Sequence, residues 1–205
     1  MSAPLICRPY RQSRNYTLRS NNEILFLQNR VAYLQDEAAY KKLFFHFHPV
    51  LLKFARAILN NRADAEEVVS EVLLKVWTMG RELNYVEHLP LFLYKSTRNK
   101  AFDYLRKRNS GLPVTAISGA EEQLADPSHT EYKLITNELD RRFQHAVSNL
   151  PKQCQLVFRL VKEQGFTYKQ VTEILEISLN TAETHMRLAL KKIRVALDDY
   201  LMPQK

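Results

Sequence analysis

The chain has 205 residues, enough for one or two domains, and its 30 Lys and Arg residues against 22 Asp and Glu give a net charge of +8. This basic balance favours an anionic partner, most simply nucleic acid, although charge alone is weak evidence. The chain contains only 4 glycines, and its apolar residues recur every three or four positions, which argues against sheets with tight turns and predicts an all-α fold.

The cysteines and the apolar runs limit the chemistry and the compartment. Cys7 and Cys154 lie far apart and fit neither a metal-binding nor a redox spacing, so we expect free thiols in a reducing cytoplasm. No apolar run approaches the ~20 residues that span a bilayer, and the N-terminus lacks the apolar core of a signal peptide. We therefore expect a soluble, cytoplasmic protein with no membrane insertion.

Residues 1–25 form a basic segment with little periodicity. Its cations precede the first acid of the chain and are Arg8, Arg11, Arg14 and Arg19. A flexible basic arm and a leader without function are equally good interpretations. Residues 26–60 follow with a helical apolar pattern, which Pro49 is expected to break or kink. His46 and His48 stand in alternate positions and cannot share a helix face, so we predict no metal site there.

Residues 62–78 predict a strongly amphipathic helix. Its apolar side carries the expected core residues Ala65, Val68, Val69, Val72, Leu73 and Val76. Its opposite side carries Glu66, Glu67, Ser70 and Glu71. Leu74 lies in the middle of this acidic face, and an apolar residue ringed by acids suggests a docking surface for a basic helical partner. A solvated face with one stray leucine is an equally good interpretation.

Residues 90–108 predict another amphipathic helix, which is basic and aromatic. The expected core stripe is Leu91, Tyr94, Ala101, Phe102 and Leu105. The other face carries Phe92, Lys95, Ser96, Asn99, Lys100, Asp103, Arg106 and Lys107. Aromatic rings among amides and cations can stack single-stranded bases and hold their backbone. The alternative, which this segment alone slightly favours, is a solvated basic face with Phe92 covering a neighbouring helix.

Residues 109–130 lose this periodicity and contain turn-forming Gly, Pro, Asn and Ser residues, which makes them the best domain boundary of the chain. Helical patterns resume around residues 135–150 and after Pro151. The predicted organisation is a basic arm over residues 1–25, a first domain over 26–109, a flexible linker over 110–130 and a second domain over 131–202.

Residues 165–194 have the pattern of a helix-turn-helix, a motif that places a short helix in the major groove of DNA. The expected buried positions are Val171, Ile174, Leu175, Ala182, Met186, Leu190 and Ile193. Ser178 in the turn is a good N-cap for the second helix. Residue types that contact bases and phosphates face outward at Asn180, Glu183, Thr184, Arg187 and Lys191. An ordinary helical hairpin with a solvated polar face is the less favoured alternative.

In combination, three of these segments resemble the bacterial RNA polymerase sigma factors, specifically their extracytoplasmic-function group. Residues 64–77, DAEEVVSEVLLKVW, are similar to the core-polymerase-binding segment of that group. Residues 92–108, FLYKSTRNKAFDYLRKR, are similar to its −10 element segment, and residues 150–158 with the helix-turn-helix are similar to its −35 domain. The resemblance spans about residues 30–200. It implies two small helical domains, a sigma region 2 bundle and a sigma region 4 helix-turn-helix domain, joined by a flexible linker.

The resemblance assigns a role to each surface. The polymerase would be bound by Asp64, Glu66, Glu67, Ser70, Glu71 and Leu74. The −10 element would be melted, and a flipped base captured, by Phe92, Lys95, Asn99, Lys100, Asp103 and Arg106 with the preceding loop. The −35 element would be contacted by Asn180, Glu183, Thr184, Arg187 and Lys191. The implied partners are core polymerase, at the clamp coiled coil and flap of its large subunits, promoter DNA and, in many members, an anti-sigma factor. No cofactor, metal ion or catalytic residue is implied.

Three positions depart from the pattern of the group. Ser70 replaces the usual glutamine of the docking helix, which removes one expected hydrogen bond. Leu188 replaces a common arginine, which removes one phosphate contact. Glu176 replaces the usual glycine of the helix-turn-helix turn, at a cost on the order of 1 kcal/mol if the position needs a positive φ.

Two other function classes fit part of the pattern. A stand-alone helix-turn-helix regulator with an N-terminal sensing or dimerisation domain would share the second domain, but it does not need the acidic face around Leu74. A helical enzyme would need an ordered nucleophile and base, a phosphate-cradling glycine loop or a metal-binding spacing, and the sequence offers none of these. We therefore expect a transcription initiation factor without catalytic activity.

Overall fold

The computed structural model describes residues 21–110 and 132–201. Every regular element within these ranges is a helix, which confirms the predicted all-α fold. The chain divides into two compact units: the helices of residues 21–110 make up the first, and most of those of residues 132–201 make up the second. The expected basic arm overlaps the first helix, which begins at Asn21. The rest of that arm, and the expected linker beyond residue 110, lie outside the described residues.

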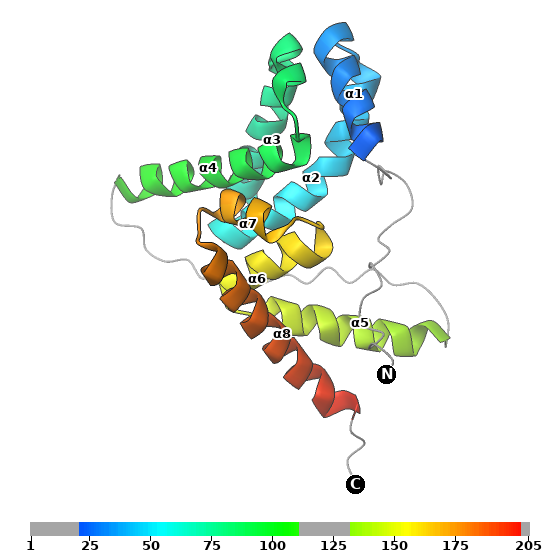
Figure 1. Ribbon diagram of the computed structural model, residues 1–205, viewed down its shortest axis with the longest axis vertical. Helices are drawn as coiled ribbons and strands as arrows, with labels where there is room; N and C mark the ends of the chain where they lie inside the picture. The colour runs from blue at the N-terminus through cyan, green and yellow to red at the C-terminus, as the bar shows by residue number, and fades with distance from the viewer. Residues whose placement is uncertain (1–20, 111–131, 202–205) are drawn as a thin grey trace. The chain divides into compact units, whose positions relative to one another are not determined.

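The first unit is a helical bundle built around one long central helix. Its elements are α1 (Asn21–Leu34), α2 (Glu37–Leu59), α3 (Arg62–Thr78), the 3₁₀ helix η1 (Gly80–Tyr85) and α4 (Leu89–Ser110) (Figure 1). The central helix α2 packs against α1, α3 and α4, and α3 also packs against α4. The predicted apolar stripe of α3 is buried at every position, namely Ala65, Val68, Val69, Val72, Leu73 and Val76. Removal of such stripes from water is the main force that assembles the bundle.

Pro49 was predicted to break or kink the helix, and the break is wrong, because α2 continues through this residue. Pro49 is exposed, so the carbonyl that loses its donor lies near the surface, where water can bind it. The chain breaks earlier, between α1 and α2, where Gln35 has a left-handed φ of +48°. A carboxylate oxygen of Asp36 then accepts hydrogen bonds from the backbone N–H groups of Ala38 and Ala39, at 2.9 and 3.1 Å. This N-cap starts α2.

The buried stripe of α4 differs in part from the predicted one. Its fully buried residues are Leu89, Leu93, Tyr94, Thr97 and Ala101. Leu91 and Leu105 are only half-buried. Phe102, which was predicted to lie in the core, is 38% exposed. It directly follows Ala101, so a helical turn of about 100° carries its ring off the core side. The ring is covered by the guanidinium of Arg98, whose carbon lies 4.6 Å from the ring centroid.

The second unit contains the predicted helix-turn-helix. Its elements are α5 (Tyr132–Ser148), α6 (Lys152–Phe158), the π-helical turn η2 (Arg159–Glu163), α7 (Tyr168–Leu175) and α8 (Leu179–Leu201) (Figure 1). The last helix, α8, packs against α5 and α6. The buried residues of the motif are Val171, Ile174, Leu175, Ala182, Met186, Ala189 and Ile193. Leu190 was predicted to be buried but is 45% exposed, because Ala189 takes its place on the inner side of α8.

Local hydrogen bonds fix the ends of α7 and the start of α8. Thr167 and Gln170 form a capping box, in which the backbone N–H of Gln170 donates to Thr167 Oγ1 at 3.3 Å. Glu176 ends α7 with a φ of +53°, so the turn has the positive φ that normally favours glycine. The backbone N–H of Thr181 donates to Ser178 Oγ at 3.1 Å, which confirms Ser178 as the N-cap of α8.

Cys154 is a free cysteine that is buried in the second unit. Burial raises the pKa of its thiol. Its Sγ atom lies 3.5 Å from Nδ1 of His185 on α8. Cys7, the other cysteine, lies outside the described residues. Among the helices that the structure describes, none is both long and apolar enough to cross a membrane.

Candidate functional site

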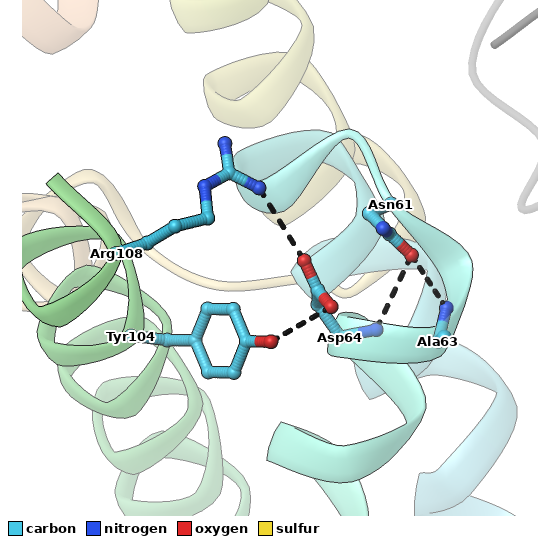
Figure 2. A network of polar contacts seen from close by, with 5 residues as sticks. All are labelled: Asn61, Ala63, Asp64, Tyr104 and Arg108. Atoms are coloured by element: carbon cyan, nitrogen blue, oxygen red, sulfur yellow. Dashed lines mark hydrogen bonds and ion pairs between the residues drawn. The ribbon is translucent and has the colours of Figure 1, made fainter. Parts of the chain in front are cut away.

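The predicted acidic face of α3 lies on the surface of the first unit. The start of α3 is fixed by Asn61, whose side-chain oxygen accepts hydrogen bonds from the backbone N–H groups of Ala63 and Asp64 at 2.8 and 3.3 Å (Figure 2). Among the exposed residues that follow on α3, we call Glu67, Ser70, Glu71 and Leu74 the acidic ridge. The side chain of Leu74 is 56% exposed, so an apolar group stands among acids on open surface.

Two other side chains of α3 that flank the ridge are anchored within the unit. Glu66 accepts a hydrogen bond at 2.9 Å from Nε of Arg62, and this bond lowers the pKa of the Glu66 carboxyl. Trp77 is half-buried, and its ring centroid lies 5.0 Å from that of Tyr40 on α2. Leu74 is therefore the large apolar side chain that α3 leaves open to a partner.

Asp64 points toward α4 (Figure 2). The hydroxyl of Tyr104 donates a hydrogen bond to its Oδ1 atom at 2.8 Å, and Nη1 of Arg108 lies 3.5 Å from its Oδ2 atom. Its side chain is only 14% exposed. The hydrogen bond to this carboxylate raises the pKa of Tyr104. Asp64, which was predicted to bind polymerase, thus joins the start of α3 to the last turns of α4.

Glu71 and Lys100 form a second link between the two helices. Nζ of Lys100 lies 2.5 Å from Oε2 of Glu71, and both side chains are about half exposed. The hydrogen bond and charge of Glu71 raise the pKa of Lys100. An acid that was predicted to bind polymerase and a cation that was predicted to bind DNA are therefore partners in this structure.

A third link lies near the other end of the same helix pair. Nζ of Lys75 on α3 lies 5.8 Å from the ring centroid of Phe92 on α4, within the range of a cation–π contact. Phe92 is half-buried. As the contacts advance along α3 from Asp64 to Lys75, their partners on α4 run backward from Arg108 to Phe92. The two helices are thus antiparallel, and the acidic ridge runs alongside the predicted −10 face.

The predicted −10 residues of α4 include several that make local contacts. Nη1 of Arg98 donates a hydrogen bond to Oδ1 of the exposed Asn99 at 3.0 Å, and Asp103 is ion-paired with Arg106 one turn later. The amide N–H₂ group of Asn99 is not used in that bond, so a donor on the exposed face remains for a base edge or phosphate. Lys95 is half-buried on the same helix.

Tyr85 is a candidate DNA-binding residue that sequence reasoning missed. It ends η1, just before α4, and its side chain is 83% exposed. The segment beneath it is fixed by the buried Gln28, whose Nε2 atom donates to the carbonyls of Leu83 and Val86 at 2.8 and 2.7 Å. A firmly held loop thus presents an aromatic ring to solvent. The signal in the sequence was an aromatic residue within the polar stretch between two amphipathic helices.

The predicted −35 face follows one side of α8 in the second unit. Asn180, Glu183, Arg187 and Lys191 are exposed, and Thr184 is half-buried. Their spacing of three and four positions puts them on one side of the helix, opposite the buried stripe that begins at Ala182. Leu188, where the resemblance led us to expect arginine, is also exposed. The face therefore offers an amide, a carboxylate, a hydroxyl and two cations together.

No three His, Cys, Asp or Glu side chains of residues 21–110 and 132–201 gather in a way that could hold a metal ion. The surfaces described above carry groups that suit molecular recognition. The first unit carries an acidic ridge beside a basic, aromatic face, and the second carries a polar helix face of the kind that reads DNA grooves.

Comparison with known sequences agrees with this arrangement. The chain matches the Sigma-70 region 2 family over residues 43–111 and the Sigma-70, region 4 family over residues 140–193. It is 22% identical over 140 residues to the ECF RNA polymerase sigma-E factor of Haemophilus influenzae, covering 65% of this chain and 74% of that protein. It is 24% identical over 149 residues to the ECF sigma factor EcfG of Rhodopseudomonas palustris, covering 73% and 80%. The ECF sigma factor SigW of Bacillus subtilis is 22% identical over 149 residues, covering 69% and 80%.

Solved structures share the fold. The structure of CnrH in complex with the cytosolic domain of CnrY superposes with a TM-score of 0.52 at 16% identity, covering 86% of this chain and 98% of that one. The sigma factor RpoE in complex with the anti-sigma factor NepR from Bartonella quintana gives a TM-score of 0.53 at 19% identity, covering 78% and 96%.

The matched regions and the fold define an RNA polymerase sigma factor, with region 2 in the first unit and region 4 in the second. Within that class the chain belongs to the extracytoplasmic-function group, whose members are non-catalytic transcription initiation factors that direct RNA polymerase to promoters.

Proposed function

We propose that this protein binds core RNA polymerase in the cytoplasm through the acidic ridge of α3. In this proposal α4 and η1 open and recognise the −10 element, and α8 reads the −35 element. The observation that carries the proposal is the exposure of Leu74 among the acids of a helix whose opposite side is fully buried. A sensing or dimerisation domain does not need such a surface, whereas a domain that binds a basic helical partner does.

The polymerase contact would combine charge with one apolar anchor. Glu67 and Glu71 would face cations of the clamp coiled coil, and Leu74 would fill an apolar site between them. Glu66 and Ser70 would lie at the edge of the same contact. Complementary charge at such a surface mainly speeds association and fixes register, while the buried apolar group supplies much of the affinity. The flap of the polymerase is proposed as the contact of the second unit.

The −10 contact would use the open side of α4 together with the loop before it. Asn99 would hydrogen-bond the edge of an unstacked base, and Tyr85 and Phe92 would offer rings for stacking. Lys95, Lys100 and Arg106 would hold the backbone of the displaced strand, with Asp103 orienting Arg106 through their ion pair.

The −35 contact would place the first turns of α8 in the major groove. Glu183, Thr184 and Arg187 lie in the middle of this face, within the first turns of α8, and would reach base edges. Asn180 and Lys191, at the two ends of the face, would bind phosphates and fix the orientation of the helix.

Regulation by an anti-sigma factor belongs to the same proposal. The RpoE structure that shares this fold is a complex with the anti-sigma factor NepR, and CnrH is bound to the cytosolic domain of CnrY. A comparable protein that covers these surfaces would keep the chain from polymerase until a signal removes it.

Co-purification with core polymerase tests the proposal. The tagged full-length chain should retain the core enzyme, and the double variant Glu67→Lys and Glu71→Lys should lose it while keeping its helical circular dichroism. The matched control makes the same charge change at Glu37 and Glu138, outside the ridge, and should bind like the wild type. If the ridge variant and the control bind equally, or if the unmodified chain binds duplex DNA tightly without polymerase, a stand-alone regulator replaces the proposal.

A further inference from the structure

We infer that Asp64 is a positioning residue, which holds the last turns of α4 against the start of α3 so that the −10 face keeps its shape, and not a contact to polymerase. The inference rests on the proposed function, because it concerns the helix that the proposal assigns to −10 DNA. It changes the role that the family resemblance gave to Asp64, while the roles of Glu67, Glu71 and Leu74 stay as proposed.

The geometry around Asp64 leaves little of its carboxylate for a partner. One oxygen accepts the hydroxyl proton of Tyr104 at 2.8 Å, and the other faces Nη1 of Arg108 at 3.5 Å (Figure 2). Only 14% of the side chain is exposed, whereas Glu67 and Glu71 further along α3 are open to solvent. If a polymerase cation captured Asp64, the hydroxyl of Tyr104 would lose its acceptor, which opposes the exchange.

The same end of α4 has few other attachments. Ala101 is the last fully buried residue of the helix before Arg108, and Leu105 is only half-buried. Beyond them the helix carries the adjacent cations Arg106, Lys107 and Arg108, all exposed, which repel one another. A carboxylate at this position offsets part of that repulsion, and it accepts hydrogen bonds from two side chains in the last turns of α4, Tyr104 and Arg108.

This end of α4 also carries a large share of the proposed DNA contacts. Asn99, Asp103 and Arg106 surround Tyr104 in the sequence and share its two helical turns. A shift of these turns would move an amide donor and a phosphate-binding cation together. The link spans 40 positions of the sequence, so it joins the proposed polymerase-binding helix to the proposed DNA-binding helix directly.

The test compares Tyr104→Phe, Asp64→Asn and the double variant, each as full-length protein assembled with core polymerase. Two quantities are measured: the affinity for core enzyme, and the rate at which a −10 region containing 2-aminopurine becomes unstacked on a promoter that the wild type opens. Loss of one hydrogen bond to a charged group should slow opening by about threefold to tenfold. Core affinity should stay within about twofold, and the losses should be less than additive in the double variant, because Tyr104→Phe removes the hydrogen bond that Asp64→Asn weakens by removing the charge.

Two matched controls separate positioning from general destabilisation. Tyr33→Phe removes an exposed hydroxyl on α1 and should leave both quantities unchanged. Asn61→Ala removes the N-cap of α3 without touching Tyr104 and should lower the urea midpoint of unfolding, while opening at moderate temperature stays near the wild-type rate.

Several results would overturn the inference. Weaker core binding by Asp64→Asn, with normal binding by Tyr104→Phe, would make Asp64 a direct polymerase contact. An unchanged rate of promoter opening in both single variants, or additive decreases of this rate in the double variant, would mean that the bond between Asp64 and Tyr104 does not position α4. If the wild-type protein itself binds no polymerase or opens no promoter, the proposed function is wrong and the inference falls with it. This result differs from failure of the inference alone, in which the wild type is active and the variants behave like it.

Discussion

Nζ of Lys100 lies 2.5 Å from Oε2 of Glu71, so a cation of the proposed −10 face and an acid of the proposed polymerase contact neutralise each other across α3 and α4. In the proposed complex, polymerase cations that approach the ridge would compete with Lys100 for the same carboxylate. Each exchange would free an ammonium group beside the DNA path. An exposed ion pair of this kind contributes at most about 1 kcal/mol. The effect of polymerase binding on the DNA contact of Lys100 is therefore modest, and it must be measured against a matched control.

Glu71→Gln should therefore raise the affinity of the free protein for a single-stranded −10 oligonucleotide, by up to about fivefold at low salt. The reason is that Lys100 no longer has an intramolecular partner. Fluorescence anisotropy with a labelled oligonucleotide measures the change. Glu67→Gln is the control, because it removes the same charge from the ridge at a residue that makes no ion pair within residues 21–110 and 132–201. Equal gains in both variants would trace the effect to net charge and contradict the specific pairing.

Neighbouring leucines of α3 should respond to alanine in opposite ways. Leu74→Ala truncates an exposed side chain and should leave the free energy of unfolding within about 0.5 kcal/mol, while weakening polymerase binding by on the order of 2 kcal/mol. Leu73→Ala truncates a buried one and should destabilise the fold by about 2–5 kcal/mol. Urea unfolding and a core-polymerase binding assay separate the two effects. A large loss of stability for Leu74→Ala would mean that this side chain packs inside the unit and is no docking anchor.

Glu176→Gly should stabilise the second unit by about 1 kcal/mol, because glycine adopts the left-handed φ of +53° without the strain of a side chain. Gly165→Ala should destabilise the same unit by a similar amount, since Gly165 has a φ of +75° that a side chain disfavours. Urea unfolding followed by circular dichroism gives both free energies. If the two changes shift the midpoint in the same direction, backbone strain does not govern this pair of positions.

Two exposed cations of α8 should affect promoter binding differently. Arg187→Ala should cost roughly 1–3 kcal/mol and relax the preference at one base pair of the −35 element. Lys191→Ala should weaken binding about equally on all sequences and reduce the salt dependence, as expected for a phosphate contact. Competition binding of the holoenzyme to a set of −35 variants measures both. A uniform loss for Arg187→Ala would reassign that residue to the DNA backbone.

The amphipathic period was enough to predict where most helices lie. Residues 62–78 were expected to form one helix, and α3 spans Arg62–Thr78 with the whole expected stripe buried. Because these six apolar residues lie on one side of the helix, only one orientation of the helix about its axis buries all of them. The N-cap Ser178 could likewise be predicted from the sequence, because its capping bond depends only on residues within one turn.

Errors arose where neighbouring apolar residues compete for one inward position. Ala189 and Leu190, and likewise Ala101 and Phe102, are adjacent on their helices, and in both pairs the smaller residue is buried. Close approach of a packed helix favours the small side chain there, and the sequence does not reveal how close that helix comes. The break that was considered at Pro49 does not occur, since a proline on the exposed side of a helix interrupts little.

The candidate site was predictable as a set of faces but not as a set of contacts. Exposure of Glu67, Glu71 and Leu74 follows from the period of α3 alone. The bond between Asp64 and Tyr104 depends on how α3 and α4 pack, and no local pattern encodes it. The exposed ring of Tyr85 was missed because it depends on Gln28, a buried polar residue of α1 that holds the loop from beneath.

Transcription reconstituted from purified components tests the central claim most directly. Core RNA polymerase from the source organism, a library of its promoter fragments and this protein should together yield RNA chains with defined 5′ ends, preceded by shared −10 and −35 sequences. The same mixture carrying the double variant Glu67→Lys and Glu71→Lys should yield none of them. Identical transcripts with and without the protein, or defined starts that survive loss of the ridge charges, would contradict the account.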